Sequence, residues 1–588
     1  MDHTLSFLQN ISATSPEVLA VVGTILGYAA WRLYRLLSFV YMTPLRVLPG
    51  PPVPSLVYGN LNEFGEVEGS FLPDQLFAKY GKNYVDHEFF MVSPEPSRFW
   101  WSTGAVLISM MATQTPRLWT LDSRAINHVL MHSTEYGRPE ETVRNRIKNF
   151  GKGILFVQGQ EHRQQRRIMN PAFGPTQVRD LTAIFVQKST QLRDIWATAA
   201  SKTGGAVRVD VSRDISKATL DIIGMAGFNY DFQALDAGDT SNELSAAFQK
   251  LFTNLRTFSL FGYLMAFLPI FKLIPNPRLK RVEEAADVIN RVGSKLVTDQ
   301  KAATAQAAAE KHVQGPERKD LQGRDLLTLL IKANMATDIP DNQKMTDEDV
   351  ISQIPTFLIA GHETTSTSTT WALYAFCKHP EVQRKLREEL LAVENETPTM
   401  EDFNALPYLD GVIRETLRLY APITQLSREA KKDDVIPLNE PMTDRYGKVH
   451  HEIRIAKGNK VMLPILAANR SKEIWGEDAL EFKYVIPTIA LLPERWIQPS
   501  AVTSTLPGVW GHLLTFIGGP RACIGYRFAL VELKALLFFL VRAFEFEFAV
   551  PAEDVVNVAA ALQRPSLRSA PKEGAQLPLV VKPYKAAA

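Results

Sequence analysis

The hydrophobic pattern first marks a segment near the N-terminus. Val18 to Trp31 is an uncharged and mostly apolar run, followed by Arg32 and Arg35 and then by further apolar residues. A bilayer-spanning helix needs roughly 20 residues, which the run reaches when the arginines snorkel to the membrane surface. We therefore expect a transmembrane anchor over residues 18–41. A cleaved signal peptide and a helix lying in the interface are the alternatives, but positive charge follows the apolar run instead of preceding it.

The charges after this run predict its orientation. The positive-inside rule places the body of the chain in the cytosol and residues 1–17 in the lumen, where Asn10 begins a glycosylation sequon. Residues 42–60 are rich in proline and predict a semi-rigid hinge. Residues 61–588 contain no internal repeat and no long low-complexity linker. The sequence thus predicts one large cytosolic domain behind a single-pass anchor.

The second long pattern is a central helix. It is predicted to start at Thr346, where Asp349 completes a capping-box signature, and to run to Lys378. Its roughly 30 residues span about 45 Å, enough to cross the whole domain. Gly and β-branched hydroxyl residues fill its middle, from Ala360 to Thr370, although they are poor helix formers. Such a midpoint suggests that a small ligand or water lies against the helix.

Composition excludes several classes of protein. The chain is 46% hydrophobic with a net charge of +2, so it is a well-buried globular protein without a nucleic-acid-binding face. Its two cysteines, Cys377 and Cys523, do not make a disulfide framework, which favours a reducing compartment. No zinc-type spacing of cysteine and histidine occurs.

The loop around Cys523 has the features of a soft metal centre with one thiolate ligand. Glycines let backbone amides approach the sulfur, and a helix that begins after the cysteine favours the ionised thiol. An arginine in the same loop matches an acidic group of a cofactor. A lone cysteine is more often a small hydrophobe, and we assign that role to Cys377. The loop residues that carry these features are Phe516, Gly519, Arg521, Cys523 and Gly525.

Four motifs, in order, resemble the cytochrome P450 haem-thiolate monooxygenases of the microsomal, fungal-like kind. They are "HRQQRR" (162–167), "AGHETT" (360–365), "ETLR" (415–418) with "PERW" (493–496), and the Cys523 loop. The resemblance covers essentially everything after the anchor. It implies a mainly α fold with small β-sheets, and haem (iron protoporphyrin IX) with Cys523 as the axial iron ligand.

The same resemblance implies roles for other residues. Glu363 and Thr364 form an acid–alcohol pair that delivers protons during oxygen activation. His162, Arg166 and Arg428 reach the haem propionates, although His162 alone is also compatible with an ordinary polar helix position. A structural network braces the core. Without the resemblance, Glu415 and Arg418 would be interpreted as a solvated ion pair worth tenths of a kcal/mol. The network consists of Glu415, Arg418 and Arg495.

The implied reaction inserts one oxygen atom from O2 into a substrate, because a thiolate ligand favours O–O cleavage. The chain has no nucleotide-binding fingerprint, so electrons come from a separate NADPH–cytochrome P450 reductase, with cytochrome b5 as a second candidate partner. We place the protein in the endoplasmic reticulum membrane, in secondary metabolism. The run 251–274 is apolar and aromatic. In the family that the chain resembles, such a region covers the substrate channel and dips into the membrane, so the resemblance implies a lipophilic substrate such as a terpenoid, sterol or fatty chain, with core packing as the alternative.

Basic residues precede and enter the "HRQQRR" segment and form either a reductase-docking face or a merely solvated one. They are Arg144, Arg146, Lys148, Lys152, Arg163, Arg166 and Arg167.

Two segments depart from the family pattern. Residues 92–114 interrupt an expected strand pair and have the length and ends of a translated intron, and residues 484–492 separate two family motifs. Both are candidate non-native insertions, and the second threatens the position of Arg495. Two further functions therefore stay open. One is a haem-thiolate isomerase or dehydratase that needs no reductase, against which Glu363 and Thr364 argue. The other is a haem-binding but inactive chain.

Overall fold

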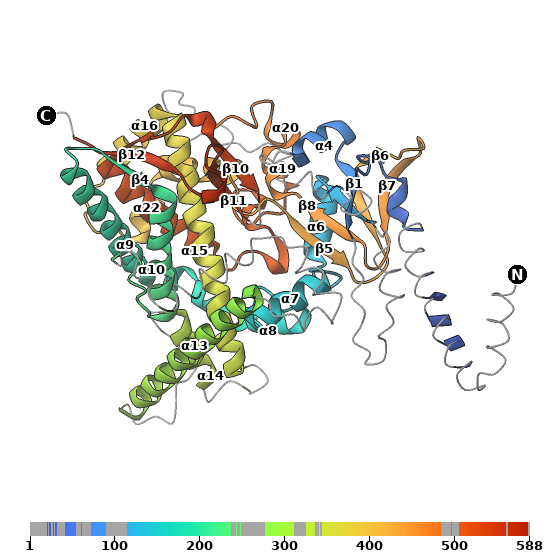
Figure 1. Cartoon of the computed structure of the whole chain (residues 1–588), viewed down its shortest axis with the longest axis horizontal. Helices are drawn as coiled ribbons and strands as arrows, with labels where there is room; N and C mark the ends of the chain where they lie inside the picture. The colour runs from blue at the N-terminus through green and yellow to red at the C-terminus, as the bar shows by residue number, and fades with distance from the viewer. Residues whose placement is uncertain are drawn as a thin grey trace, which may run out of the picture.

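The protein is described by a computed structural model. It covers residues 42–54, 72–89, 114–236, 277–310, 325–335, 344–483, 505–559 and 562–585, together with single positions between and before these ranges. Helices dominate, and the strands form small separate sheets, with β4 and β12 on the left of the view and β1, β6 and β7 on the right (Figure 1). The predicted fold class, mainly α with small sheets, is confirmed.

Fifteen described helices build most of the molecule. They are α4 (Leu72–Tyr80), α6 (Ser123–Met131), α7 (Glu140–Phe150), α8 (Gly159–Met169), α9 (Pro175–Lys202), α10 (Val211–Phe228), α13 (Pro277–Glu310), α14 (Leu326–Met335), α15 (Asp347–Lys378), α16 (Pro380–Leu391), α17 (Met400–Asn404), α18 (Pro407–Leu419), α19 (Ile465–Arg470), α20 (Lys472–Trp475) and α22 (Tyr526–Ala543).

The described strands form four sheets. The largest has the order β1-β2-β8-β5-β3, the second has the order β4-β12-β9, and β6-β7 and β10-β11 are hairpins. The strands are β1 (Asn83–Phe89), β2 (Gln114–Thr120), β3 (Tyr136–Gly137), β4 (Val207–Asp210), β5 (Leu426–Ala430), β6 (Asp434–Thr443), β7 (Val449–Ile455), β8 (Lys460–Leu463), β9 (Phe544–Phe548), β10 (Val555–Ala559), β11 (Gln563–Leu567) and β12 (Pro578–Pro583).

The central helix α15 begins and ends as the sequence predicts. The Thr346 hydroxyl accepts a hydrogen bond from the Asp349 amide and caps the first turn. From there the helix passes between the other elements to Lys378 (Figure 1). Most of its second half is buried on all sides, as expected for a helix in the core of a large domain.

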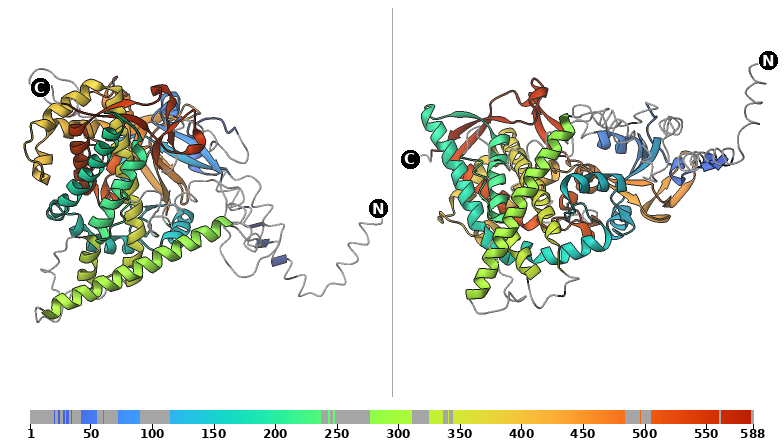
Figure 2. Two further views of the ribbon diagram at one scale, coloured as in Figure 1. Left: turned by 60° about the vertical axis from the view of Figure 1, so that its left-hand side comes forward. Right: turned by 60° about the horizontal axis from the view of Figure 1, so that its bottom comes forward.

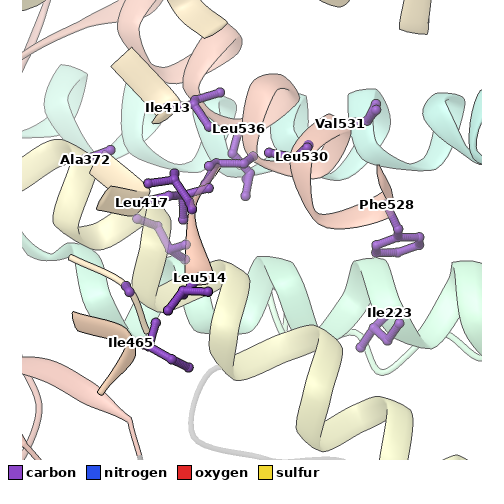
Figure 3. Packing of buried hydrophobic residues seen from close by; sticks show 14 of the residues in the cluster. Ile223, Ala372, Ile413, Leu417, Ile465, Leu514, Phe528, Leu530, Val531 and Leu536 are labelled. Carbon is purple, nitrogen blue, oxygen red and sulfur yellow. The ribbon is translucent and has the colours of Figure 1, made fainter. Parts of the chain in front are cut away.

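Helix α22 packs beside α15 in the same core. Its apolar residues, among them Leu530 and Leu536, lie among side chains from α18 and the segment before α22 (Figure 3). Edge-to-face rings of Phe185 and Phe528, 4.7 Å apart, join it to α9. This packing fixes the start of α22, and with it the loop that contains Cys523.

The alanine-rich stretch that follows Thr298 is helical as far as Glu310, where α13 ends. It therefore belongs to a long helix and not to a linker. Helix α13 crosses the molecule along one side (Figure 2). Three segments with sequence predictions lie outside the described residues, namely 251–274, 484–492 and 92–113.

Strands β1 and β2 form the predicted pair, which is antiparallel, with Glu88 opposite Thr115. Removing residues 92–114 would leave three residues, 89 to 91, between these two partners, which is an ordinary hairpin connection. We expect the deletion variant to fold and bind haem at least as well as the parent. Spectroscopic haem content per purified protein measures this, with a Gly/Ser segment of equal length as the control. A deletion variant without haem would contradict it.

Asp74, in the first turn of α4, gives a pH-dependent prediction. Burial raises the pKa of its carboxyl to about 6, against the opposing charge of Arg470. The carboxyl of an unfolded aspartate has a pKa of ~3.9. The contribution of Asp74 to the free energy of unfolding is therefore fully present below that pH and is lost as pH rises through about 6. We expect Asp74→Asn to raise the unfolding free energy by about 1 kcal/mol at pH 8, after allowing for partial solvent exposure.

Thermal or denaturant unfolding from pH 4 to 8 measures this effect. The difference between Asp74→Asn and the parent should shrink as pH falls, whereas Glu283→Gln, at an exposed position on α13, should show no trend. A constant difference across the range would contradict the assignment.

Among the described residues, no helix is both long enough and apolar enough to cross a bilayer. The predicted anchor, 18–41, is described only at scattered positions. Its topology therefore stays a prediction.

Candidate active site

The Cys523 loop is held by its backbone. The Cys523 amide donates to the Phe516 carbonyl at 2.9 Å, which closes the loop before α22 begins at Tyr526. Gly519 has φ +75°, and a Cβ there would lie 2.7 Å from the Leu130 carbonyl oxygen. Any other residue at this position would therefore be strained. Gly525 differs, because a Cβ there would only reach ordinary contact with Phe173.

The Cys523 side chain is exposed, although protein surrounds it closely enough to perturb its ionisation. Burial raises the pKa of the thiol, while the Gly525 amide and the Arg166 charge oppose that rise. The sequence-based expectation that the surroundings favour the ionised thiol is therefore only partly right. The amide and the cation are in place, but their effect on the thiol pKa is smaller than that of the surrounding protein atoms.

Four arginines lie around this loop and form what we call the arginine cluster. Each lowers the pKa of a neighbour, and burial lowers the pKa of all four, of Arg138 to about 9 and of Arg428 and Arg521 to about 10. Burial and these charges also lower the pKa of His162 to about 3, so it is neutral. The cluster consists of Arg138, Arg166, Arg428 and Arg521.

The arginine cluster has no carboxylate partner among the described residues. Its hydrogen bonds go to main-chain carbonyls, from Arg166 to Ala522 at 2.6 Å and from Arg521 to Val157 at 3.0 Å. The Arg138 Nε is buried and has no acceptor. Several cations buried together without a counterion are costly unless an anion joins them. A dianionic cofactor beside a single thiolate ligand fits this set, and the two propionates of haem supply those charges.

The predicted propionate-binding residues thus lie together, and the structure adds Arg138. Strand β3 pairs with β5, with Tyr136 opposite Ala430, and this brings Arg138 next to Arg428. The two are 290 residues apart in the chain (428 − 138). The sequence holds no local signal for this contact, because a pairing of two short strands is not visible in a motif.

The oxygen-activation segment, Ala360–Thr365, lies on α15 without any break in the helix. The Thr364 hydroxyl donates to the Ala360 carbonyl at 2.6 Å, one turn back. Ala360 is exposed and Thr364 is half-buried, although the turns that follow are buried. The predicted weak midpoint is therefore regular helix in which most hydroxyls bond to the backbone, and its open side includes the exposed Ala360.

Glu363 on α15 forms an ion pair with Arg564 on β11, in the β10–β11 hairpin. The acid and the alcohol of the predicted pair are thus adjacent in the chain, and the acid is tied to a cation. Arg564 was not foreseen from the sequence, because it lies in a short C-terminal strand without a distinctive motif.

Glu415 and Arg418 form a buried, two-pronged ion pair on α18, with N···O distances of 2.7 and 3.0 Å. Arg418 also donates to the carbonyls of Asn469 and Glu481 at 3.0 and 3.1 Å, and to that of Ala479. The Trp496 indole and the Lys483 amide both donate to Glu415 at 3.2 Å. Two of the three predicted network members therefore meet as expected.

The third member, Arg495, lies outside the described residues. Its neighbour in the same motif, Trp496, contacts Glu415 directly, which the sequence analysis did not foresee. The segment before the Cys523 loop is fastened to the same network, because the Thr515 hydroxyl donates to the Leu417 carbonyl at 2.8 Å and accepts from the Asn469 amide at 2.8 Å. The ion pair thus braces the loop that precedes Cys523.

Comparison with known proteins agrees with this site. A sequence model of the cytochrome P450 family matches residues 104–567. Cytochrome P450 monooxygenases 205 and 128 of Postia placenta are each 46% identical to the chain, over 98% of it and 99% of the relative. A ganoderic acid synthetase of Ganoderma lucidum is 30% identical over 91% of the chain and 93% of its own length.

The chain belongs to the cytochrome P450 family. Its cofactor is haem and its activity class is that of a monooxygenase, an oxidoreductase that needs a redox partner and a small-molecule substrate.

Proposed function

We propose that this protein inserts one oxygen atom from O2 into a lipophilic small molecule, with Cys523 as the axial ligand of its haem. The arginine cluster carries this proposal, because four buried or half-buried arginines, with no carboxylate partner among the described residues, lie around the loop of the exposed cysteine. Haem with a thiolate ligand supplies the chemistry of O–O cleavage. The chain's own residues hold that group, exclude competing reactions and handle protons.

Each side of the site has a separate task in this proposal. The Gly525 amide and Arg166 stabilise negative charge on the Cys523 sulfur. Arg138, Arg428 and Arg521 pair with the propionates, and His162, being neutral, donates a ring N–H to the same groups. Phe516 packs within the loop, 5.9 Å from Trp510 by ring centroid, and stiffens the turn before the cysteine.

On helix α15, Thr364 holds a proton at its Oγ1, which donates to the Ala360 carbonyl at rest. Rotation of this hydroxyl offers the proton to the open side of α15. Glu363 exchanges protons with water only after it separates from Arg564, so we assign it the second step of the relay. A Thr364→Ala variant should therefore divert reducing equivalents to peroxide more strongly than Glu363→Gln.

Electrons come, in this proposal, from NADPH–cytochrome P450 reductase, with cytochrome b5 as an additional donor. Exposed basic side chains on α7 and α8 and between them support a docking face for acidic partners. They are Arg144, Lys148, Lys152, Arg163 and Arg167. Lys152 is partly neutralised by Glu161 at 3.3 Å, and Arg146 and Arg166 are half-buried, so neither of the latter belongs to the face.

The anchor proposal places residues 18–41 across the endoplasmic reticulum membrane, with Asn10 in the lumen. At the described positions of this segment Tyr28, Trp31 and Tyr34 are exposed, and the Thr24 hydroxyl donates to the Ala20 carbonyl at 2.8 Å as in a helix. Exposed aromatic side chains at a helical spacing favour a bilayer surface over water. A glycosidase-sensitive mass shift that disappears in Asn10→Gln tests the orientation.

A lipophilic substrate follows from the anchor, because a membrane-bound enzyme meets such molecules at their highest concentration. One relative is named as a synthetase of ganoderic acid, and this name gives a precedent for a small organic molecule as the substrate class. Terpenoid, sterol and fatty-chain compounds are therefore the first classes to screen.

Reconstitution tests the proposal. Microsomes with the full chain and reductase should oxidise a lipophilic substrate only when NADPH is present. Arg163→Glu with Arg167→Glu should slow reduction of the haem, measured by stopped flow under carbon monoxide, while Arg179→Glu on α9, whose exposed side chain pairs with Glu401, should not. Turnover without NADPH would favour the isomerase alternative, and bound haem without turnover would favour an inactive chain.

A further inference from the structure

One residue of the oxygen-activation segment has no role in the site described above. His362 stands directly before Glu363 and Thr364 on α15. Successive residues of an α-helix are turned by about 100° around its axis, so the side chain of His362 lies on nearly the opposite face of the helix from that of Thr364. Its partners therefore belong to an element behind the segment.

That element is α10, which lies beside α15 (Figure 1). The Ser216 hydroxyl and the Nε2 atom of His362 are 2.7 Å apart and share a hydrogen bond. The Thr219 hydroxyl donates to the main-chain carbonyl of His362 at 3.1 Å. Helix α10 thus holds both the side chain and the backbone of His362.

The residue before His362 explains how the two helices come so close. A Cβ at Gly361 would lie 2.9 Å from two carbon atoms of the Ile223 side chain. Ile223, which is labelled in Figure 3, is buried and fills the space that the glycine leaves. It shares one face of α10 with Ser216 and Thr219, because the three residues are spaced as i, i+3 and i+7. We call Ser216, Thr219 and Ile223 the α10 latch.

The latched turn of α15 depends on support from outside the helix. It contains a glycine and β-branched hydroxyl residues, which favour a helix less than alanine or leucine does. The helix is nevertheless regular here. Because tertiary packing supplies most of the stability of a helix in a protein, contacts with neighbouring elements hold this turn in shape. The α10 latch provides such contacts on the side away from Thr364.

The bond between Ser216 and His362 is suited to holding a position. A serine hydroxyl both donates and accepts, so it bonds to the ring nitrogen whether or not that nitrogen carries a proton. The second bond, from Thr219, ends on the main chain and is independent of the ring. The latch therefore holds His362 in either protonation state.

We propose that His362 is a positioning residue, which the α10 latch holds so that the Thr364 hydroxyl keeps its place in the site. The inference rests on the role proposed for Thr364. A displacement of that hydroxyl by about 1 Å is enough to impair proton delivery. The role needs a hydrogen-bonding atom near the position of Nε2 and not an imidazole. Glutamine carries such an atom at a similar reach, whereas phenylalanine keeps a ring without it.

A double-mutant cycle on the haem-loaded full chain tests this proposal. The variants are His362→Phe, Ser216→Ala and their combination, with His362→Gln as the conservative replacement. Reductase, NADPH and O2 are supplied without a substrate, so electrons leave either as hydrogen peroxide or, after O–O cleavage, as water. NADPH consumption and peroxide formation together give the ratio of peroxide to water. The second readout is the free energy of unfolding, which requires no turnover.

We expect His362→Phe and Ser216→Ala each to raise the ratio of peroxide to water by roughly fivefold, as the loss of one hydrogen bond shifts a population. The double variant should be no worse than either single variant, because both remove the same bond. His362→Gln should match the parent. The control is Ser212→Ala, which removes a half-buried hydroxyl one turn earlier on α10 and should leave the ratio unchanged.

Three results would overturn the proposal. The first is a parent-like ratio in both single variants, which would make the bond merely structural even if both variants unfold more easily. The second is additive effects of His362→Phe and Ser216→Ala, which would mean that the two residues act separately. The third is a His362→Gln variant as impaired as His362→Phe, which would make the imidazole itself the active group.

The two proposals fail separately. If Thr364→Ala leaves the ratio unchanged, the proton role of Thr364 is wrong, whatever the cycle shows. If Thr364→Ala raises the ratio and the latch variants do not, only the positioning role of His362 is wrong. The unfolding cycle between His362 and Ser216 decides in either case whether their bond contributes to the fold.

Discussion

Replacing Arg418 with leucine should cost about 3–5 kcal/mol of unfolding free energy and leave little haem-loaded protein. The substitution strands the Glu415 carboxylate in the core, where it is almost completely buried. It also removes the donors for three main-chain carbonyls, of Asn469, Ala479 and Glu481. Each carbonyl left without a donor adds its own desolvation cost.

Denaturant unfolding and haem content per protein measure this effect. Glu415→Leu should be similarly damaging, and the double variant should recover only part of the loss, because the three carbonyls still lack Arg418. Arg418→Lys should behave like Arg418→Leu, since an ammonium group does not reproduce the guanidinium fork. Arg384→Leu on α16 is the control, because its exposed i,i+4 pair with Glu388 is worth about 0.5 kcal/mol or less. An Arg418→Leu variant as stable as the control would contradict the account.

The elements that the sequence predicted well have local causes. Helix α15 starts at a capping threonine and ends before a proline, so neighbouring residues alone define its limits. The Cys523 loop is equally local, because a positive φ at Gly519 and a helix that begins at Tyr526 follow from adjacent residues. Such features are encoded within one stretch of chain.

The contacts that the sequence analysis missed are long-range. Arg138 meets Arg428 through strand pairing, and Arg564 reaches Glu363 from the β10–β11 hairpin. Neither of these contacts depends on spacing along the chain. They arise from how sheets and helices pack, which a single sequence without relatives does not reveal.

Burial also changes the expected contribution of the Glu415–Arg418 ion pair to the free energy of unfolding. Spacing alone makes Glu415 and Arg418 an exposed helical pair worth tenths of a kcal/mol. The structure buries both, so breaking the pair becomes one of the most damaging changes in the chain. The residues were identified correctly, but the size of their effect depends on the solvent they exclude.

Replacing Cys523 with serine should abolish monooxygenase activity. A serine hydroxyl stays protonated under these conditions and is a poor ligand for iron, so the electron donation of a thiolate is lost. The arginine cluster is unchanged in this variant and still pairs with the propionates. We therefore expect some haem to remain bound, in a form that turns over no substrate.

The other cysteine provides the matched control. Cys377 lies near the end of α15, half-buried, and burial raises the pKa of its thiol. No described feature of the site contacts it, so Cys377→Ser should retain both haem and activity.

The difference spectrum between the reduced full chain with and without carbon monoxide, recorded in microsomes, tests the central claim most directly. The parent and Cys377→Ser should both show the strongly red-shifted Soret band of a thiolate-ligated haem, and Cys523→Ser should lack it. A band that persists in Cys523→Ser, or haem in the parent without that band, would contradict the assignment of Cys523 as the axial ligand.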